Sequence, residues 1–106
     1  MNDYYILDNK TVKKIQDVQT WASWYETADK RVKLDCIGNC KISTIFLGRN
    51  YRWFDNGRPL LFETVVFGGK LNQNQWRCST WNEAIIQHEA VCEKVQFLEE
   101  EKISSG

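Results

Sequence analysis

The side chain with the widest chemical range in this sequence is its single histidine, His88. An imidazole can act as a general acid, a general base or a metal ligand near neutral pH. His88 lies between Ile85 and Cys92 at a spacing that places all three on the apolar face of a predicted helix. We therefore predict a core histidine whose ring nitrogens are satisfied by neighbours. Glu63, the one acid on an otherwise apolar strand face, is the predicted partner. The pair is interpreted as a structural lock, with a polar pocket as the alternative.

Cysteine is the other residue type here that could do chemistry, and there are four: Cys36, Cys40, Cys78 and Cys92. With His88 they are numerous enough for one zinc site, but closed zinc sites usually contain C-x2-C pairs. Cys36 and Cys40 are spaced C-x3-C across a predicted hairpin, where pairing of Ile37 with Cys40 would turn the two thiols to opposite faces. A nucleophilic Cys92–His88 pair would face the core without access for a substrate. We expect reduced, packed thiols, with no metal and no cofactor.

A segment that is both basic and aromatic is the best candidate for a binding surface. Arg49, Arg52 and Arg58 lie close together in a predicted loop, with Trp53 among them. Guanidinium groups can bind phosphates while an indole ring stacks on a base, so the segment predicts a ligand or partner site. The alternative is a solvated loop whose aromatic rings pack under the sheet.

Composition and motifs argue against several functional classes. The chain has 14 basic and 14 acidic side chains, whereas a DNA-wrapping protein needs a basic excess and a DNA mimic an acidic one. Glycine-rich phosphate loops and nucleophile-elbow motifs are absent from the sequence. No apolar run approaches the roughly 20 residues that cross a bilayer, and the N-terminal residues show no signal-peptide pattern. We expect a cytoplasmic protein without a membrane role, for which nucleic acid is the less favoured partner.

Two helices are predicted to position these residues. Asp17 is a suitable N-cap for a helix over about residues 18–29, whose apolar side chains recur at helical spacing. A longer helix over about residues 81–98 follows Thr80, which forms with Glu83 the T-x-x-E pattern of a capping box. Consecutive glutamates then oppose the helix dipole, so the acidic and polar tail, residues 99–106, is expected to be frayed.

Alternating polarity and β-branched residues predict about four to six short antiparallel strands. They are expected over Tyr4–Leu7, Thr11–Ile15, Val32–Cys36, Ile42–Leu47, Leu60–Phe67 and Trp76–Cys78. Gly38-Asn39 suits a two-residue hairpin turn between the third and fourth of these. The predicted fold class is therefore α+β. Residues 1–98 form a single domain in which a small antiparallel sheet packs against the two helices.

Several segments resemble a family of small uncharacterised bacteriophage and prophage proteins. They are the strand ISTIFLG from Ile42, the strand PLLFETVVFGG from Pro59, and the helix start STWNEA from Ser79 with the histidine that follows it. The resemblance spans about residues 4–95 and implies a phage-encoded protein that acts in the cytoplasm of the bacterial host. Family members tend to carry an Asp-His pair after the FLG strand end. This chain has Asn50-Tyr51 there, so no acid–base pair is expected at that position.

Small size, balanced charge and the lack of catalytic motifs favour a non-catalytic binding protein that modulates a host process. The expected partner is a host protein, for instance a component of a defence system that the protein inhibits, or a nucleotide ligand that it captures. One alternative is a small hydrolase or nuclease that uses His88 and Glu63. Another is a nucleic-acid-binding module. A homodimer is a further alternative for the protein's own assembly.

Overall fold

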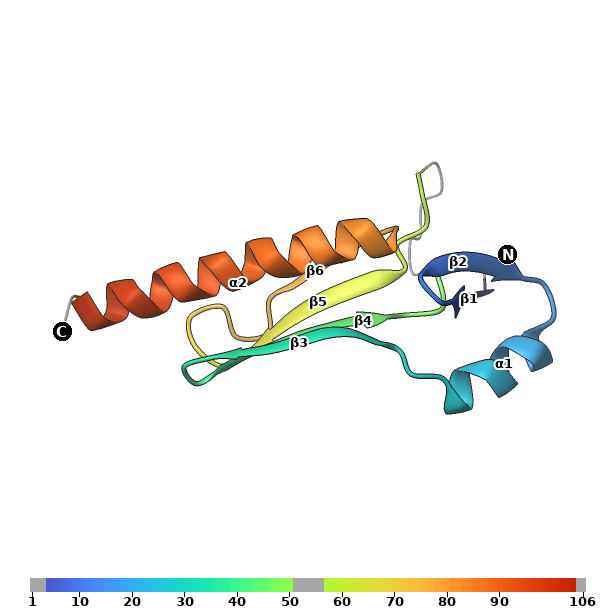
Figure 1. Ribbon diagram of the computed structural model, residues 1–106, viewed down its shortest axis with the longest axis horizontal. Helices are drawn as coiled ribbons and strands as arrows, with labels where there is room; N and C mark the ends of the chain where they lie inside the picture. The colour runs from blue at the N-terminus through green and yellow to red at the C-terminus, as the bar shows by residue number, and fades with distance from the viewer. Residues whose placement is uncertain (1–3, 51–56, 105–106) are drawn as a thin grey trace.

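Six strands and two helices make up the computed structural model, which describes residues 4–50 and 57–104, with side chains as far as Glu100. In chain order they are β1 (Tyr4–Asp8), β2 (Thr11–Ile15), α1 (Val18–Thr27), β3 (Arg31–Ile37), β4 (Cys40–Phe46), β5 (Phe62–Phe67), β6 (Gln75–Cys78) and α2 (Trp81–Ser104). Figure 1 shows an elongated molecule in which α2 lies along a four-stranded sheet, while the β1–β2 hairpin and α1 lie beyond one end of that sheet. The predicted α+β class is confirmed.

The four-stranded sheet is an antiparallel meander in the order β3-β4-β5-β6. As predicted, a two-residue turn joins β3 to β4, with Ile37 paired to Cys40. Gly38 in this turn has a φ of 57°, a left-handed conformation that glycine adopts without a steric penalty. The turn fixes the register of the hairpin and places Asp35 opposite Ile42. Asp35 therefore shares a sheet face with the core residues of β4.

The face of the sheet under α2 holds most of the core. Alternate residues of β4 and β5 are buried there: Cys40, Ile42, Thr44, Phe46, Phe62, Thr64 and Val66. From α2 the buried residues recur at helical spacing: Ala84, His88, Val91 and Val95. Each buried apolar side chain contributes about 1.5–3 kcal/mol. Two threonines and a histidine thus lie within an otherwise apolar interface.

The β1–β2 hairpin and α1 close one end of this core. Asp17 caps α1 as predicted, because its carboxylate accepts hydrogen bonds from the amide of Gln19 (3.2 Å) and the hydroxyl of Thr20 (2.6 Å). The indole of Trp24 meets the ring of Phe46 edge-on, with ring centroids 5.9 Å apart, and so ties α1 to β4. The helix ends at Thr27, slightly before the predicted end at residue 29.

Helix α2 starts where the capping box predicted, and it extends further than predicted. The amide of Glu83 donates to the Thr80 hydroxyl (3.1 Å), and the Glu83 carboxylate accepts from the amide of Thr80 (3.2 Å). The helix continues to Ser104, so residues 99–104 are helical and the predicted frayed tail is corrected for them. Glu99 gives the reason, because its carboxylate accepts from the buried Cys40 thiol (3.3 Å) and lies against Gly69.

The opposite side of the four-stranded sheet is covered by neither helix in the described part of the chain (Figure 1). We call it the open sheet face and define it by the residues that the strand register turns away from α2: Arg31, Leu34, Cys36, Lys41, Ser43, Ile45, Glu63, Val65, Phe67, Gln75 and Arg77. Leu34 and Phe67 are large apolar side chains that remain 38% and 49% exposed on it. Among the described residues, neither helix combines the length and apolar character that crossing a membrane requires.

Candidate functional site

A continuous chain of hydrogen bonds runs through the interface between the sheet and α2. His88 Nε2 lies 2.8 Å from Asp35 Oδ2, and His88 Nδ1 lies 2.7 Å from Thr44 Oγ1. Thr44 Oγ1 is in turn 2.6 Å from Thr64 Oγ1, which accepts a hydrogen bond from the Gln87 amide at 3.1 Å. The Gln87 amide also donates to the carbonyl of Trp76. The chain thus links β3, β4, β5, β6 and α2.

The strand register brings these side chains together. Thr44 and Thr64 are directly opposite one another on the α2 side of neighbouring antiparallel strands, which is the pairing that lets two hydroxyls meet. Both are fully buried, as is His88, which projects from α2 between Ala84 and Val91. Buried polar groups must be paired to offset the loss of water, and each of these three has a partner on both sides.

All donors and acceptors of this hydrogen-bond chain are satisfied when its protons run in one direction. The Gln87 amide donates to Thr64, and in this arrangement the Thr64 hydroxyl donates to Thr44 and the Thr44 hydroxyl donates to His88 Nδ1. His88 then carries its proton on Nε2 and donates it to Asp35. This assignment gives each of the three buried side chains a hydrogen-bond partner on both sides. These hydrogen bonds hold the His88 ring in one orientation.

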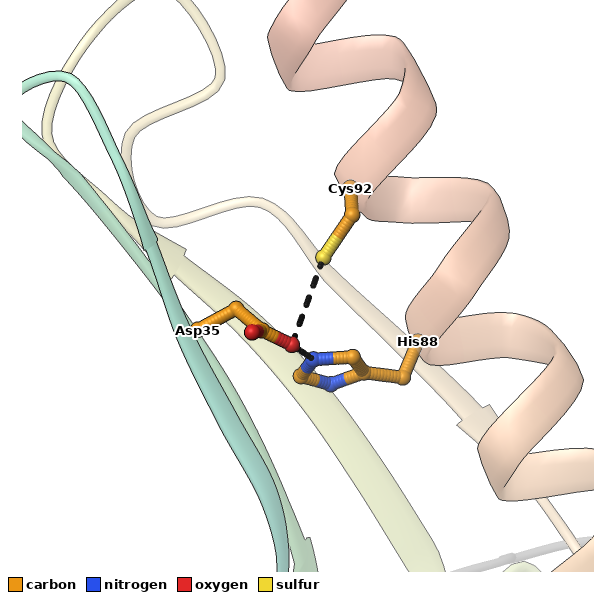
Figure 2. Close-up of side chains that lie close together, drawn as sticks. All are labelled: Asp35, His88 and Cys92. Carbon is orange, nitrogen blue, oxygen red and sulfur yellow. Dashed lines mark hydrogen bonds and ion pairs between the residues drawn. The ribbon is translucent and has the colours of Figure 1, made fainter.

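Cys92 lies one helical turn after His88 and completes a small cluster. Figure 2 shows the Cys92 sulfur and a ring nitrogen of His88 both directed at the same carboxylate oxygen of Asp35. The thiol donates a weak hydrogen bond to Asp35 Oδ2 at 4.0 Å. Burial raises the pKa of the Cys92 thiol to about 11, and the Asp35 and Glu89 carboxylates act in the same direction. The thiol is therefore protonated at neutral pH and is a poor nucleophile.

Charged side chains surround the outer side of this cluster. Lys33, two residues before Asp35 on β3, forms an ion pair with Glu89 of α2. Cys92 also borders an open groove of about 450 Å³ along α2, lined by Glu89, Cys92, Glu93, Gln96, Phe97 and Glu100. Asp35 keeps 44% of its side chain exposed, whereas His88 is fully enclosed. The cluster therefore has a closed inner side and an outer side that is open to solvent.

Comparisons with models of protein families, with curated proteins and with solved structures find no match to this chain. What the chain does must accordingly be inferred from its own geometry. The Asp35–His88–Thr44–Thr64 chain has the residue types of an acid–base relay. Both threonines and the histidine are sealed in the core, however, so no substrate can reach the hydroxyls.

The structure separates the two residues that sequence reasoning had paired. Glu63 lies on the open sheet face, where it forms an ion pair with Arg77 across β5 and β6 (2.9 Å). His88 lies on the α2 side of the same sheet and is paired with Asp35. The predicted Glu63–His88 pair is therefore wrong, because neighbouring positions in a strand point to opposite faces and Thr64, not Glu63, faces the helix. The prediction of a buried, satisfied histidine is confirmed.

The basic and aromatic segment is only partly described by the structure. The Arg49 guanidinium lies over the ring of Tyr4, 5.4 Å from its centroid. Arg58 forms an ion pair with Glu83 at the start of α2 (2.7 Å). Arg52 and Trp53 lie outside the described residues. The two described arginines are thus engaged with different elements of the fold.

The cysteines are free, and they do not gather at one place. Cys36 is exposed on the open sheet face, whereas Cys40 is buried on the α2 side, as the hairpin register predicts. The residue that sequence reasoning missed is Asp35, which lies within the predicted strand Val32–Cys36. The Gly38-Asn39 turn in the sequence could have predicted its position. A two-residue turn pairs Asp35 with Ile42 and so turns its carboxylate toward the helix.

Proposed function

We propose that this chain is a non-catalytic binding protein that engages a protein partner through its open sheet face. The open sheet face is the observation that carries the proposal. Sheet faces in folded proteins are normally packed against another layer, and large exposed apolar patches mark interaction sites. Here the strands present Leu34, Ile45, Val65 and Phe67 on the side that neither helix covers.

The strand register organises this face into cross-strand rows. One row is Cys36, Lys41 and Phe67; the next is Leu34, Ser43, Val65 and Gln75; a third is Arg31, Ile45, Glu63 and Arg77. Apolar and polar side chains are therefore mixed on this face: Ser43 lies at its centre, Leu34 on the edge strand β3 and Phe67 at the end of β5. Glu63 is neutralised by Arg77, which leaves Arg31 and Lys41 as the surplus charge. A partner surface that combines apolar side chains with acidic ones would complement this pattern.

The buried polar chain supports the non-catalytic part of the proposal. His88 and the two threonine hydroxyls are enclosed, only the Asp35 end of the described hydrogen-bond chain reaches solvent, and the neighbouring Cys92 thiol is protonated. Residues that are locked by mutual hydrogen bonds specify a fold more readily than they turn over a substrate. A hydrolase that uses Glu63 with His88 is not supported, since the two lie on opposite sides of the sheet.

The identity of the partner class rests on the sequence. Because several segments resemble phage and prophage proteins, we propose a phage-encoded protein that acts in the bacterial cytoplasm and binds a host protein, such as a component of a defence system. Capture of a nucleotide through the segment from Arg49 to Arg58 is the second candidate. The described part of this segment adds no support, because Arg49 lies over the Tyr4 ring and Arg58 is paired with Glu83.

Native mass spectrometry of the protein purified from infected cells tests the proposal. We expect one host protein to be retained at a fixed stoichiometry. Phe67→Asp, which places a charge on the open sheet face, should abolish the complex. Ile86→Asp is the matched control, because Ile86 is also a large exposed apolar residue (70% exposed) but lies on α2.

Three outcomes would contradict the proposal. One is recovery of the bare monomer alone, and another is loss of the complex in both variants to the same extent. The third is retention of a nucleotide instead of a protein, which would favour ligand capture. Retention of a second copy of the chain that Phe67→Asp abolishes would identify the open sheet face as a homodimer interface and would overturn the host-protein assignment.

A further inference from the structure

We infer that Asp35, His88 and Cys92 form a binding site for a divalent metal ion of the Zn²⁺ class. Each offers one ligand atom, and the carboxylate oxygen, the ring nitrogen and the sulfur all lie within 4.8 Å of one another. Two of the three come from one face of α2 and the third from β3, which packs against it (Figure 2). The expectation of no metal rested on cysteine spacing, and it did not include Asp35.

The separations between these atoms are close to those of a tetrahedral site. With zinc bonds of about 2.0–2.3 Å to oxygen, nitrogen and sulfur, neighbouring ligand atoms lie roughly 3.3–3.6 Å apart. Here the His88 Nε2 to Asp35 Oδ2 distance is 2.8 Å, and the Cys92 Sγ to Asp35 Oδ2 distance is 4.0 Å. One distance must lengthen and the other must shorten, each by roughly half an ångström. A rotation of the half-exposed Asp35 carboxylate supplies such a change without moving the backbone.

The second nitrogen of His88 already has the partner that a metal-bound histidine needs. Metal-ligating imidazoles usually donate their other N–H to a fixed acceptor, which orients the ring. Thr44 Oγ1 lies 2.7 Å from His88 Nδ1 and is itself held by Thr64. When a metal binds, the imidazole proton moves from Nε2 to Nδ1, the Thr44 hydroxyl turns toward Thr64, and the Cys92 thiol releases its proton to solvent. The Thr64 hydroxyl then loses its acceptor, a cost that works against binding.

The electrostatic surroundings favour a cation. Asp35 and Glu89 carry negative charge beside the cluster, and Lys33 offsets one of them through its ion pair with Glu89. The remaining charge of Asp35 faces the ring nitrogen. The groove beside Cys92 adds the carboxylates of Glu93 and Glu100, so a cation reaches the cluster along an acidic surface. Three protein ligands leave a fourth position on this outer side for water.

The choice of metal follows from the ligands. Thiolate, imidazole and carboxylate together suit Zn²⁺ and its spectroscopic substitute Co²⁺, whereas Mg²⁺ and Ca²⁺ prefer sites made of oxygen atoms. A bound ion would join β3 to α2 at the point where the helix crosses the strand. It would thereby raise the free energy of unfolding by linkage.

Titration of the metal-free full-length protein with Co²⁺ tests the inference. We expect a thiolate-to-cobalt charge-transfer band that saturates at one equivalent and is displaced by Zn²⁺. Cys92→Ser should abolish the band, and Asp35→Asn should weaken Co²⁺ binding at least about tenfold. Cys36→Ser is the matched control: Cys36 lies on the open sheet face, so this variant should keep the band unchanged.

A measurement on the unmodified protein keeps the test valid if a variant fails to fold. His88 is the only histidine, so its ring ¹⁵N resonances in long-range ¹H–¹⁵N spectra are unambiguous. Zn²⁺ should move the proton from Nε2 to Nδ1. Unchanged ring resonances at saturating Zn²⁺ would overturn the inference. A cobalt band that survives in Cys92→Ser, or disappears in Cys36→Ser, would overturn it equally.

Discussion

Replacement of Thr44 by valine is the sharpest test of the buried hydrogen-bond chain. Valine has nearly the shape of threonine, so the substitution removes the hydroxyl and leaves the packing of β4 almost unchanged. Two hydrogen bonds are lost, to His88 Nδ1 at 2.7 Å and to Thr64 Oγ1 at 2.6 Å. Both partners are fully buried, away from bulk solvent that could replace the lost bonds. The ring nitrogen is left without a donor and the Thr64 hydroxyl without an acceptor.

The magnitude follows from these two orphaned groups. Each buried unsatisfied group costs about 1–3 kcal/mol, and burial of the added methyl group offsets a fraction of a kcal/mol. We therefore expect Thr44→Val to lower the free energy of unfolding by about 2–4 kcal/mol. For a domain of this size, stable by about 5–15 kcal/mol, this is a large share of the total. Thr64→Val should cost less, about 1–2 kcal/mol. Thr44 still donates to His88 in that variant, and Gln87 keeps its bond to the Trp76 carbonyl.

Urea unfolding followed by tryptophan fluorescence measures these losses. Thr11→Val on β2 is the matched control, since Thr11 is exposed and its replacement should change stability by less than about 0.5 kcal/mol. The double variant Thr44→Val with Thr64→Val should lose less than the sum of the single variants, because the two hydroxyls share one bond. A loss for Thr44→Val no larger than that of Thr64→Val, or equal to the control, would refute the proposed direction of the chain.

Three further predictions concern the frame around the cluster. Thr80→Ala removes the hydroxyl that caps α2 and should lower the free energy of unfolding, measured in urea, by about 1 kcal/mol. An unchanged unfolding midpoint would show that the Glu83 half of the capping box suffices. Gly69→Ala should lower the free energy of unfolding by about 2 kcal/mol, because Gly69 has a φ of 72° and the new methyl group would lie 2.6 Å from Cys40 Sγ. An unfolding midpoint equal to that of the wild type would contradict this prediction. Burial raises the pKa of the Cys78 thiol from 9.0 to about 11. The folded state holds this proton more tightly than the unfolded state. Its contribution to the free energy of unfolding is therefore fully present below pH 9.0 and is lost as the pH rises toward 11. Allowing for partial solvent exposure, the stability of the wild type should fall by about 1–2 kcal/mol more over this range than that of Cys78→Ala, and parallel pH curves would argue against burial of the thiol.

Local signals in the sequence predicted the elements well. The capping box at Thr80, the N-cap at Asp17 and the Gly38-Asn39 turn each rest on contacts within a few residues, and all three are confirmed. The end of α2 was placed too early because dipole repulsion among the glutamates was considered alone. The Cys40–Glu99 contact that helps to hold the C-terminal part of the helix joins residues far apart in the chain, and no local pattern reports it.

The hydrogen-bond partners of His88 were predicted less well than the elements. Periodicity correctly placed the histidine toward the core, and Glu63 was then chosen because it interrupted an apolar face. Both faces of β5 carry apolar residues, so polarity alone does not show which one meets α2. Asp35 was overlooked, although the two-residue turn determines its side of the sheet. Working out the hairpin register before choosing partners would have found it.

The same two-residue turn also limits how this protein can change in length. Side chains alternate between faces along a strand, so one residue inserted between Ile37 and Cys40 would exchange the two sides of β3 if its pairing with β4 slipped by one. Asp35 would then point to solvent, and Leu34 or Cys36 would face the ring of His88. The β1–β2 connection is also a two-residue turn, and Leu7 and Val12 behind it pack against the core. Single-residue insertions should therefore be excluded at both two-residue turns, and at Gly38 they would also dismantle the cluster around His88.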